Sequence, residues 1–408
     1  MARRREALRA SRASVTLRGA SAMRIHWFAV YAAIMVACQW ATVLLFHRLL
    51  RRRGPAGPAD AAGVCVIVPC KGAIPGLTEN ARSLLAQDLP GARFLFVVPS
   101  EQDPAFAPVE EAARGDARAQ VLVSRAGAPR LCSGKIVDLL YALDRLPDGC
   151  EIVAFADADL RVRPDWLRRL LAPLGEPGVA VTTSCALYVA EDPGFWTFLR
   201  MVWMAAVVPY AALTGCVIGH SFALRRADLR ALRVPEVWSR SLLEDISLAA
   251  VVRAAGRKVR FVGGAMSAST ESCDRAVFFG LLNKWVLCLR VYDLRVWAAA
   301  FMAVFMHAWM IAVTLLKPGV DPRPAALLLL GDAAAVALQL LSYQAVVPDR
   351  LAALHPRWRP LPLWGALAAP MLWLSYGLQI GHSMTQSTVR WGGRVYALRG
   401  PQDVEVVG

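Results

Sequence analysis

The chain has 408 residues, of which 56% are hydrophobic and 19% are charged. Because soluble proteins carry about a quarter charged residues, this composition excludes an ordinary water-soluble protein and predicts that part of the chain lies in lipid. The formal net charge is +15, but there is no zinc-finger pattern or basic–aromatic repeat, and arginines gather beside apolar runs, so the expected partner is an anionic lipid bilayer rather than nucleic acid.

The N-terminal part joins a basic stretch to an apolar one. Residues 1–24 are rich in Arg and Ala and are expected to form a disordered basic tail. The alternative is that the start of the chain is assigned too early and that Met23 is its true first residue. Residues 25–50 are apolar over a length that crosses a bilayer, which needs about 20 residues. The run is too long for a signal peptide and lacks a small-residue cleavage site, so it predicts a retained transmembrane anchor.

From Val64 onward, short strand-like runs alternate with helical ones. The first run, VCVIVP, is continuously apolar and rich in β-branched residues, as is typical of a buried parallel strand. Further strands are expected at 92–98, 120–124, 151–159, 179–184 and 258–263, with helices at 78–87, 104–114 and 135–146. This alternation predicts βαβ units, a mostly parallel sheet and one cytosolic α/β domain over residues 63–275.

Several apolar segments follow the first strands. Segment 195–213 lies inside the α/β region and carries Arg200 and Pro209, which favours an interfacial or re-entrant helix over a true span, with a buried core helix as the alternative. Residues 276–295 mix aromatic and Arg side chains as membrane-interface segments do. Residues 296–384 predict about three transmembrane helices, at 296–316, 325–347 and 361–380, and residues 385–408 a C-terminal tail.

The strongest chemical motif is AFADADLRV, residues 154–162. Asp157 and Asp159 follow a predicted strand at a spacing that places both side chains on one side of an extended segment. In an open α/β sheet, ligands bind at the carboxyl ends of the strands. Two carboxylates there suit Mg²⁺ or Mn²⁺ holding a diphosphate. The competing interpretation is a capping or turn pair of aspartates.

A second acidic pair lies in SLLEDISLA, where Glu244 and Asp245 precede a helix-like run. A carboxylate at this place is either an N-cap or a general base that takes a proton from an acceptor hydroxyl. An anchor, a carboxylate pair after a strand and an acidic pair before a helix form a combination that capping does not predict. His220, alone in an apolar strand-like run, is expected to be a hydrogen-bonded core residue rather than the base.

Nine cysteines are scattered along the chain without a CxxC pair or a metal-ligand spacing. Several, such as Cys65 and Cys288, lie in apolar runs, where a free cysteine behaves as a small hydrophobe. The pattern favours a reduced, cytosol-facing domain over a disulfide framework.

In its motifs the chain resembles the ceramide glucosyltransferases, membrane-bound members of the GT-A family-2 glycosyltransferase group. The resemblance runs from about Val64 to the end of the chain, with order and spacing both matched. It rests on IVPCKGAIPGL (67–77), SGKIVDLL (133–140), ADADLRVRPD (156–165), GCVIGHSFALRRADL (215–229), LLEDISLA (242–249) and TVRWGGRVYALR (388–399).

The resemblance implies a GT-A nucleotide-diphospho-sugar transferase fold for the α/β domain. It also implies a UDP-sugar donor, usually UDP-glucose, and transfer of the hexose to ceramide at the cytosolic face of the membrane. Asp157 and Asp159 would hold the metal and the diphosphate, and Asp245 would be the base. The nucleotide would lie near Lys71, Gly72 and Lys135.

Two positions depart from the family's pattern. Where the family has an Asp that contacts the nucleotide base, this chain has Ser100, so either Glu101 or Asp103 takes over the contact or base recognition is looser. The family's late motif, Gln or Arg, two residues, then Arg-Trp, reads Leu281-Leu282-Asn283-Lys284-Trp285 here. Lys284 and Trp285 are expected to stabilise the departing diphosphate and to stack on the acceptor site, although Lys gives a point charge where Arg gives a fork.

Three alternative functions stay open at the level of the sequence. The acceptor is another lipid, such as a hopanoid or a polyprenyl phosphate; or the chain is a processive polysaccharide synthase; or it is a non-catalytic membrane scaffold with a degenerate nucleotide-sugar fold. A synthase is expected to keep Gln-x-x-Arg-Trp and to have more spans, and this chain has neither.

Overall fold

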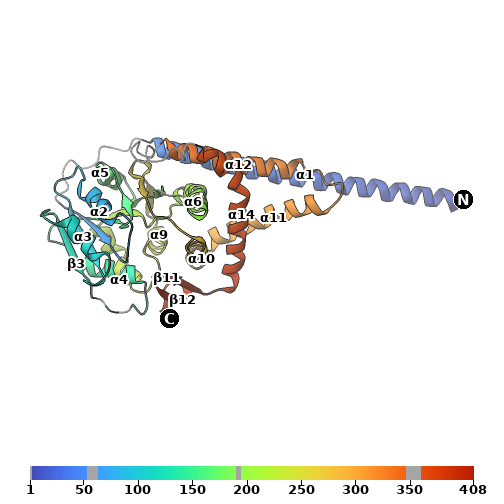
Figure 1. Cartoon of the computed structure of the whole chain (residues 1–408). Helices are drawn as coiled ribbons and strands as arrows, with labels where there is room; N and C mark the ends of the chain where they lie inside the picture. Colours follow the sequence, from blue (N-terminus) through green and yellow to red (C-terminus); the bar gives the residue numbers. More distant parts are fainter. Residues whose placement is uncertain (1, 53–62, 126, 128, 190–193, 346–359) are drawn as a thin grey trace.

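The computed structural model describes residues 2–52, 63–125, 127, 129–189, 194–345 and 360–408. It consists of an α/β body, a small C-terminal sheet at the body's edge, and a group of long helices that extends from one side (Figure 1). The body corresponds to the α/β region that the alternating pattern predicts.

The body is built on a seven-stranded sheet of order β3-β2-β1-β4-β8-β6-β9. Its strands are β1 (Val64–Pro69), β2 (Arg93–Val98), β3 (Ala119–Val123), β4 (Ile152–Ala156), β6 (Val179–Ser184), β8 (Ser221–Arg225) and β9 (Lys258–Phe261). Neighbouring strands are parallel except where β8 pairs with β4 and β6. The mostly parallel sheet predicted from the sequence is confirmed.

Helices cover both faces of this sheet, because successive strand side chains point to opposite sides. In β1, Val66 and Val68 join one hydrophobic core, and Ile67 joins the other. The first core is closed by α2 (Leu77–Leu85), α3 (Phe106–Ala113) and α5 (Trp166–Leu171). The second is closed by α4 (Gly134–Leu143), α8 (Val234–Trp238) and α9 (Glu244–Ala254), with α7 (Arg226–Ala231) between β8 and α8.

Two smaller sheets complete the body. One joins β5 (Leu160–Arg161), β10 (Ser267–Ser269) and β7 (Ala186–Tyr188). The short 3₁₀ turn Ala172–Gly175 follows α5, and the turn Gly263–Ala265 precedes β10. The other is antiparallel and consists of β11 (Thr388–Trp391), β12 (Arg394–Gly400) and β13 (Asp403–Val406), where only a tail was expected over 385–408. Its alternating apolar residues, among them Val389 and Tyr396, pack against Leu287. Gly392 and Gly393 make its first turn with φ of 56° and 79°, a conformation that suits glycine.

Within the described residues, five helices are long and apolar enough to cross a membrane. They are the Trp27–Arg51 part of α1 (Ala2–Arg51), α6 (Phe195–Leu213), α11 (Leu294–Leu316), α12 (Arg323–Gln344) and α14 (Leu361–Thr385). The backbone of α1 is helical from Ala2, which differs from the disordered tail expected over 1–24, because Ala and Arg both favour helices. Residues 346–359, which include the end of the expected 325–347 span, lie outside the described part of the chain.

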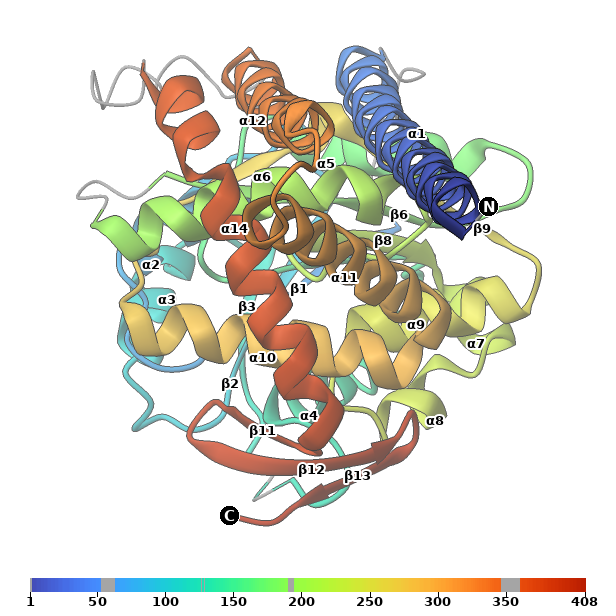
Figure 2. The same cartoon turned by 90° about the vertical axis from the view of Figure 1, so that its right-hand side faces the viewer.

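The apolar helices run in two directions. In Figure 1, α1, α11 and α12 extend together away from the body, while α6 and α10 (Arg275–Tyr292) are seen end-on and α14 runs across the base of the group. Figure 2 shows α6, α10 and α14 lengthwise over the face of the body. Segment 361–380, predicted as a third C-terminal span, thus lies crosswise to α1 and α12.

Helix α6 is tied to the body by its arginine. The guanidinium of Arg200 is fully buried, donates to Oε2 of Glu271 at 2.9 Å, and lies 3.7 Å from the ring centre of Tyr188. A charge in the middle of a lipid-facing span is costly, whereas a charge paired with the body is satisfied. This contact favours the interfacial interpretation of segment 195–213 over a true span.

Small residues let α12 approach its neighbours closely. A Cβ at Gly331 would lie 2.5 Å from the side chain of Val36 in α1, and one at Gly365 of α14 would overlap the side chain of Leu340. Helices that pack in lipid commonly use glycine in this way.

Candidate active site

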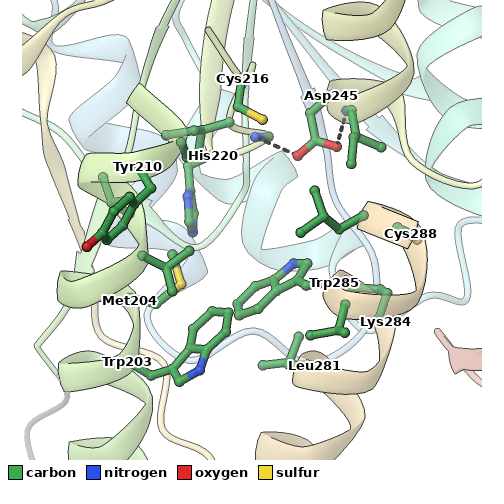
Figure 3. A pocket seen from close by; sticks show the side chains of 18 of the residues that line it. Trp203, Met204, Tyr210, Cys216, His220, Asp245, Leu281, Lys284, Trp285 and Cys288 are labelled. Atoms are coloured by element: carbon green, nitrogen blue, oxygen red, sulfur yellow. Dashed lines mark hydrogen bonds between the residues drawn. The ribbon is translucent and has the colours of Figure 1, made fainter. Parts of the chain in front are cut away.

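One cavity of about 1030 Å³ lies between the sheet and the apolar helices. Its polar end is lined by Lys71, Lys135, Asp138, Asp157, Asp159, His220, Glu244, Asp245, Lys284, Trp391 and Tyr396. The rest of its wall comes from α1, α6, α10, α11, α12 and α14 and is largely apolar. Figure 3 shows this junction, with α6 and α10 presenting Trp203 and Trp285 to one another below Asp245. A charged surface and an apolar surface therefore line the same cavity.

The two aspartates of the ADAD motif lie at the carboxyl end of β4, on the cavity wall. The backbone N–H of Asp157 donates to the carbonyl of His220 at 2.9 Å, which fixes the turn that carries both carboxylates. Oδ1 of Asp157 accepts from Nζ of Lys135 at 2.5 Å, and Oδ2 of Asp159 accepts from Oγ of Ser269 at 2.6 Å. The pair does more than cap a turn.

Two carboxylates are a partial metal site. Within the described part of the chain, no group of three or more His, Cys, Asp or Glu is placed to hold a metal ion. Mg²⁺ and Mn²⁺ bound with a nucleotide take one or two carboxylates and complete their shell with phosphate and water oxygens. Asp157 and Asp159 therefore fit a cation that binds together with a diphosphate.

Lys135 connects the two acidic motifs. Its Nζ lies 2.5 Å from Oδ1 of Asp157 and 2.5 Å from Oε1 of Glu244. Burial by itself would lower the pKa of Lys135, but the charges and hydrogen bonds of the two carboxylates outweigh it and raise the pKa. Lys135 is positioned by the start of α4, where Oγ of Ser133 accepts from the N–H of Ile136. The site therefore has a fixed positive charge between its two acidic groups.

Asp245 lies in the first turn of α9, next to the cavity. Its Oδ2 accepts from the backbone N–H of Gly219 at 2.9 Å, and its Oδ1 accepts from the N–H of Ile246 at 2.6 Å. Burial and the neighbouring charge of Glu244 raise the pKa of Asp245 to about 6, although Lys135 opposes the shift. A carboxylate with a pKa near neutral pH is suited to accept a proton from a hydroxyl.

The variant late motif places its residues on α10. Lys284 is buried, and its Nζ lies 4.3 Å from the ring centre of Trp391 in the C-terminal sheet. Burial lowers the pKa of Lys284. The ring of Trp285 stacks on that of Trp203 in α6 at 5.3 Å, and Leu281 lines the cavity one turn before. Lys284 thus faces the charged end of the cavity, and Trp285 faces the apolar end.

The residues expected around the nucleotide are only partly brought together. Lys71 lies on the cavity wall and donates to the carbonyl of Gly392 at 3.3 Å. The N–H of Gly72 donates to Oδ1 of Asp103 at 2.7 Å, so Asp103 is engaged within the chain. Glu101 pairs with Arg125 at 2.6 Å on the surface.

The cavity wall does not include Gly72, Ser100 or Glu101. Ser100 follows β2, two strands away from the β4 carboxylates in the sheet. Of the residues expected to bind the donor, Lys71, Lys135 and Asp157 are therefore the ones that line the cavity.

The structure adds residues that the sequence motifs did not single out as site residues. Trp391, Gly392 and Tyr396 of the C-terminal sheet line the cavity, as does Asp138 of α4. Burial raises the pKa of Asp138 to about 6, although its carboxylate accepts from Oγ of Ser124 at 2.6 Å. The TVRWGGRVYALR motif carried part of the family resemblance, but only a tail was expected over 385–408, and no spacing along the chain places this segment against α10.

His220 is buried and lies on the cavity wall, so its assignment as a core residue rather than the base stays a prediction. Its Nε2 lies 3.0 Å from the hydroxyl of Tyr188, and burial lowers its pKa. All nine cysteines are free.

Comparison with known proteins assigns the family. The model of "Glycosyl transferase family 21" matches residues 28–404. The chain belongs to glycosyl transferase family 21. The resemblance to family-2-type glycosyltransferases is thus confirmed at the level of the family, and with the mostly parallel sheet it confirms the predicted GT-A fold class.

Solved glycosyltransferase structures resemble this one at low identity. The mannosyltransferase PcManGT from Pyrobaculum calidifontis, in complex with GDP-Man and Mn²⁺, is 20% identical with a TM-score of 0.45 over 88% of this chain and 96% of its own. Glucosyl-3-phosphoglycerate synthase from Mycobacterium tuberculosis, with Mn²⁺, UDP-Glc and phosphoglyceric acid, is 17% identical with a TM-score of 0.40 over 59% and 84%. S. aureus TarS, with UDP-GlcNAc, is 14% identical with a TM-score of 0.37 over 85% and 99%. No curated protein matches the chain.

Proposed function

We propose that this glycosyltransferase moves a hexose, glucose in the first instance, from a UDP-sugar to the hydroxyl of a membrane lipid, with ceramide as the expected acceptor. One observation carries the proposal: a single cavity has charged groups at one end and, at the other, walls from α1, α6, α11, α12 and α14. A nucleotide sugar suits the first end, and a lipid tail suits the second.

The reaction is a single displacement at the anomeric carbon. Asp245 accepts the proton of the lipid hydroxyl, whose oxygen forms a bond to the anomeric carbon as the bond to the diphosphate breaks on the opposite side. The configuration at that carbon is therefore inverted. Support for Asp245 as the base is its position on the cavity wall and its raised pKa.

Positive side chains stabilise the departing diphosphate. Lys135 is held beside Asp157, and Lys284 faces the same end of the cavity from α10. Mg²⁺ or Mn²⁺ on Asp157 and Asp159 would supply further positive charge when bound. Fixed charges in a partly dry cavity stabilise a developing negative charge more strongly than water does.

The lipid acceptor enters between the helices that lie across the body. Trp203 of α6 stacks on Trp285 of α10 and meets Tyr376 of α14 edge-on, at ring-centre distances of 5.3 Å and 6.1 Å. All three rings line the cavity. They would guide the lipid headgroup toward Asp245.

The same proposal places the protein in a membrane as a multi-pass protein, with the α/β body on the cytosolic side. The projecting helices α1, α11 and α12 are apolar and long enough to span. The free state of all nine cysteines agrees with a reducing compartment.

Transfer by purified full-length protein tests this function. UDP-glucose and other UDP-hexoses would be incubated with ceramide in micelles, with Mn²⁺ and after chelation, and the lipid product identified by its added mass. Asp245→Asn is the matched variant, since it keeps the shape of the side chain and removes the base. If wild type and Asp245→Asn are equally inert with every donor and lipid, the enzyme proposal fails. A product on another lipid but not on ceramide would correct the acceptor alone.

A further inference from the structure

A second cavity, of about 370 Å³, lies where the ends of α1 and α6 meet α9 and β9. Ligand pockets typically have volumes of about 300–1,000 Å³. The helix ends contribute apolar side chains to its wall, such as Leu49 and Leu213. The body contributes positive ones, and we call the cavity the basic pocket after them: Arg253, Arg257, Lys258 and Arg260. Among the described residues, no Asp or Glu lines the basic pocket.

The basic pocket lies at the boundary between the body and the helices that project from it. Leu49 belongs to the last turn of α1, and the ring centre of Phe46, also in α1, lies 5.4 Å from that of Phe261 in β9. Figure 2, which views the molecule from the side of the projecting helices, shows β9 beside α1. Leu45 shares a face of α1 with Leu49, four residues on, and is 47% exposed. If α1 spans a bilayer, the basic pocket therefore lies near the lipid headgroups.

Positive charge exceeds negative charge around the basic pocket. Three carboxylates pair with the basic side chains here, and none of the three lines the pocket. Asp228 pairs with both Arg225 and Arg257, Asp293 with Arg253, and Glu176 with Arg260. Lys258 is exposed and forms no ion pair with any described residue. Five basic side chains thus share three carboxylates.

These ion pairs are open to solvent and leave donors free to bind a ligand. The side chains of Arg253, Arg257 and Arg260 keep 49%, 37% and 34% of their surface exposed. Exposed ion pairs contribute about 0–1 kcal/mol, so rearranging one costs little. A guanidinium has five N–H donors, and a single carboxylate does not occupy all of them.

Neutralising helix ends is the other role that positive side chains could have here, because α6 and α9 both end at the basic pocket. Backbone groups already bond these ends. At the end of α9, the carbonyl of Val252 accepts from the N–H of Arg257 at 3.0 Å. At the end of α6, the carbonyl of Ala211 accepts from the N–H of Cys216 at 2.9 Å. Capping therefore does not account for four positive side chains on one wall.

The end of α1 adds further positive charge on the same side of the body. Arg48 and Arg51 lie in its last turn, Arg52 follows it, and all three are exposed. Near an anionic membrane surface, each basic residue contributes about 1 kcal/mol of attraction. The surroundings of the basic pocket thus favour a lipid that carries negative charge.

We propose that the basic pocket binds the phosphate of an anionic membrane phospholipid, whose acyl chains lie along the apolar face of α1 that carries Leu45. Guanidinium groups bind phosphate with two parallel hydrogen bonds, and an ammonium group adds a point charge. Among the described residues, the wall of the basic pocket shares only Thr214 with the cavity of the candidate active site, so this lipid is neither donor nor acceptor. The inference rests on the proposed placement of α1 in a membrane.

The test measures which lipid the full-length protein binds. Protein purified in detergent would be titrated with phosphatidylglycerol or phosphatidylcholine, and the dissociation constant of each obtained by native mass spectrometry. The rise in Tm would be measured with each lipid and with inorganic phosphate, which has the charge but no acyl chains. Glycosyl transfer would be assayed on the same preparations.

The main variant carries Arg257→Gln and Lys258→Gln, which remove two charges from the wall while Arg225 still pairs with Asp228. Lys258→Gln alone is the second variant, since it breaks no ion pair with a described residue.

The matched control removes two charges elsewhere, with Arg82→Gln and Arg114→Gln. Both residues are exposed, and Arg82 pairs with Glu111 as Arg257 does with Asp228. They lie in α2 and directly after α3, at the end of the body away from the projecting helices (Figure 1).

We expect wild type to bind phosphatidylglycerol about tenfold more tightly than phosphatidylcholine, and added salt to reduce the difference. The main variant should lose this preference, Lys258→Gln should lose part of it, and the control should keep it. No preference in wild type would overturn the proposal and assign the positive side chains to the helix ends. An equal loss in the control would assign the preference to net charge and overturn the pocket.

Two further outcomes separate this inference from others. If inorganic phosphate raises the Tm as much as phosphatidylglycerol does, the ligand is a soluble phosphate and the lipid proposal fails. A preference for phosphatidylglycerol that the main variant loses, without transfer to any lipid, would support the basic pocket while the proposed function fails. Transfer without any such preference would do the reverse.

Discussion

The backbone N–H of Gly219 donates to Oδ2 of Asp245 at 2.9 Å, and this approach requires a residue without a side chain at position 219. A Cβ there would lie 2.9 Å from the same oxygen and 3.1 Å from Oε1 of Glu244. The loop before β8 and the start of α9 therefore meet through one hydrogen bond. That bond orients the carboxylate proposed as the base.

Replacing this glycine should impair catalysis more than folding. We expect Gly219→Ala to lower kcat at least about tenfold, because the added methyl displaces the Asp245 carboxylate, and a small misplacement of a catalytic group is costly. Steady-state kinetics and thermal unfolding would be measured together. Gly280→Ala is the control: it lies in α10 with open space around its Cβ and should leave kcat unchanged. Equal kcat in Gly219→Ala and wild type would show that the contact does not position the base.

The raised pKa of Asp245 sets the expected pH dependence. A carboxylic acid with a pKa of about 6 is protonated below that pH and then cannot accept the hydroxyl proton. The rate should therefore be full above about pH 7 and fall as pH decreases through 6, to about a tenth at pH 5. The measurement is kcat/KM against pH under conditions where the fold is retained.

The titration of Asp138 must be distinguished from that of Asp245 in this pH profile, because burial also raises the pKa of Asp138 to about 6. The acid limb should persist in Asp138→Asn, whatever its overall rate. The residual activity of Asp245→Asn should not decrease as the pH falls through 6. A limb that disappears in Asp138→Asn would assign the titration to Asp138 instead.

Lys135 is expected to matter for stability as well as for catalysis. Its Nζ lies between Asp157 and the buried carboxylate of Glu244, so Lys135→Met leaves Glu244 without its counter-charge. Removing one partner of such a pair typically costs about 3–5 kcal/mol, and exposure of Lys135 places the effect at the lower end. Thermal unfolding in detergent should show a lower Tm for Lys135→Met, partly restored in Lys135→Met with Glu244→Gln. A double variant no more stable than the single one would contradict the pairing.

The parts of the site that could be predicted from the sequence are those set by local patterns. A buried strand followed by two aspartates places Asp157 and Asp159 at the sheet edge, and an acidic pair before a helical run places Asp245 at a helix start. The contact of Lys135 with Glu244 spans more than a hundred residues, and no periodicity encodes it. Local position also suggested Ser100 and Glu101 near the donor; Glu101 pairs with Arg125 and neither residue lines the cavity, so their part in donor binding stays a prediction.

The direction of the apolar helices was the other part that the sequence could not decide. Both α12 and α14 are long and apolar enough to span, with 22 and 25 residues and a mean hydropathy of 1.9 and 1.2, yet α14 crosses the base of the helix group (Figures 1 and 2). Its direction follows from packing against α10 and α12, which depends on contacts such as Gly365 with Leu340. Composition predicts only that such a segment is buried in protein or lipid, and does not predict its direction.

The C-terminal sheet should be part of the catalytic machinery. The ring of Trp391 lies 4.3 Å from Nζ of Lys284 and contributes to the wall of the cavity. A cation over an indole face gains about 0.5–2 kcal/mol, so Trp391→Leu should weaken the placement of Lys284 and reduce kcat roughly threefold to thirtyfold. The matched control is Trp364→Leu, because Trp364 is exposed on α14 and does not line the cavity. If Lys284→Met and Trp391→Leu act independently, their effects on kcat multiply; since the ring acts through the ammonium, we expect the double variant to be no slower than Lys284→Met alone.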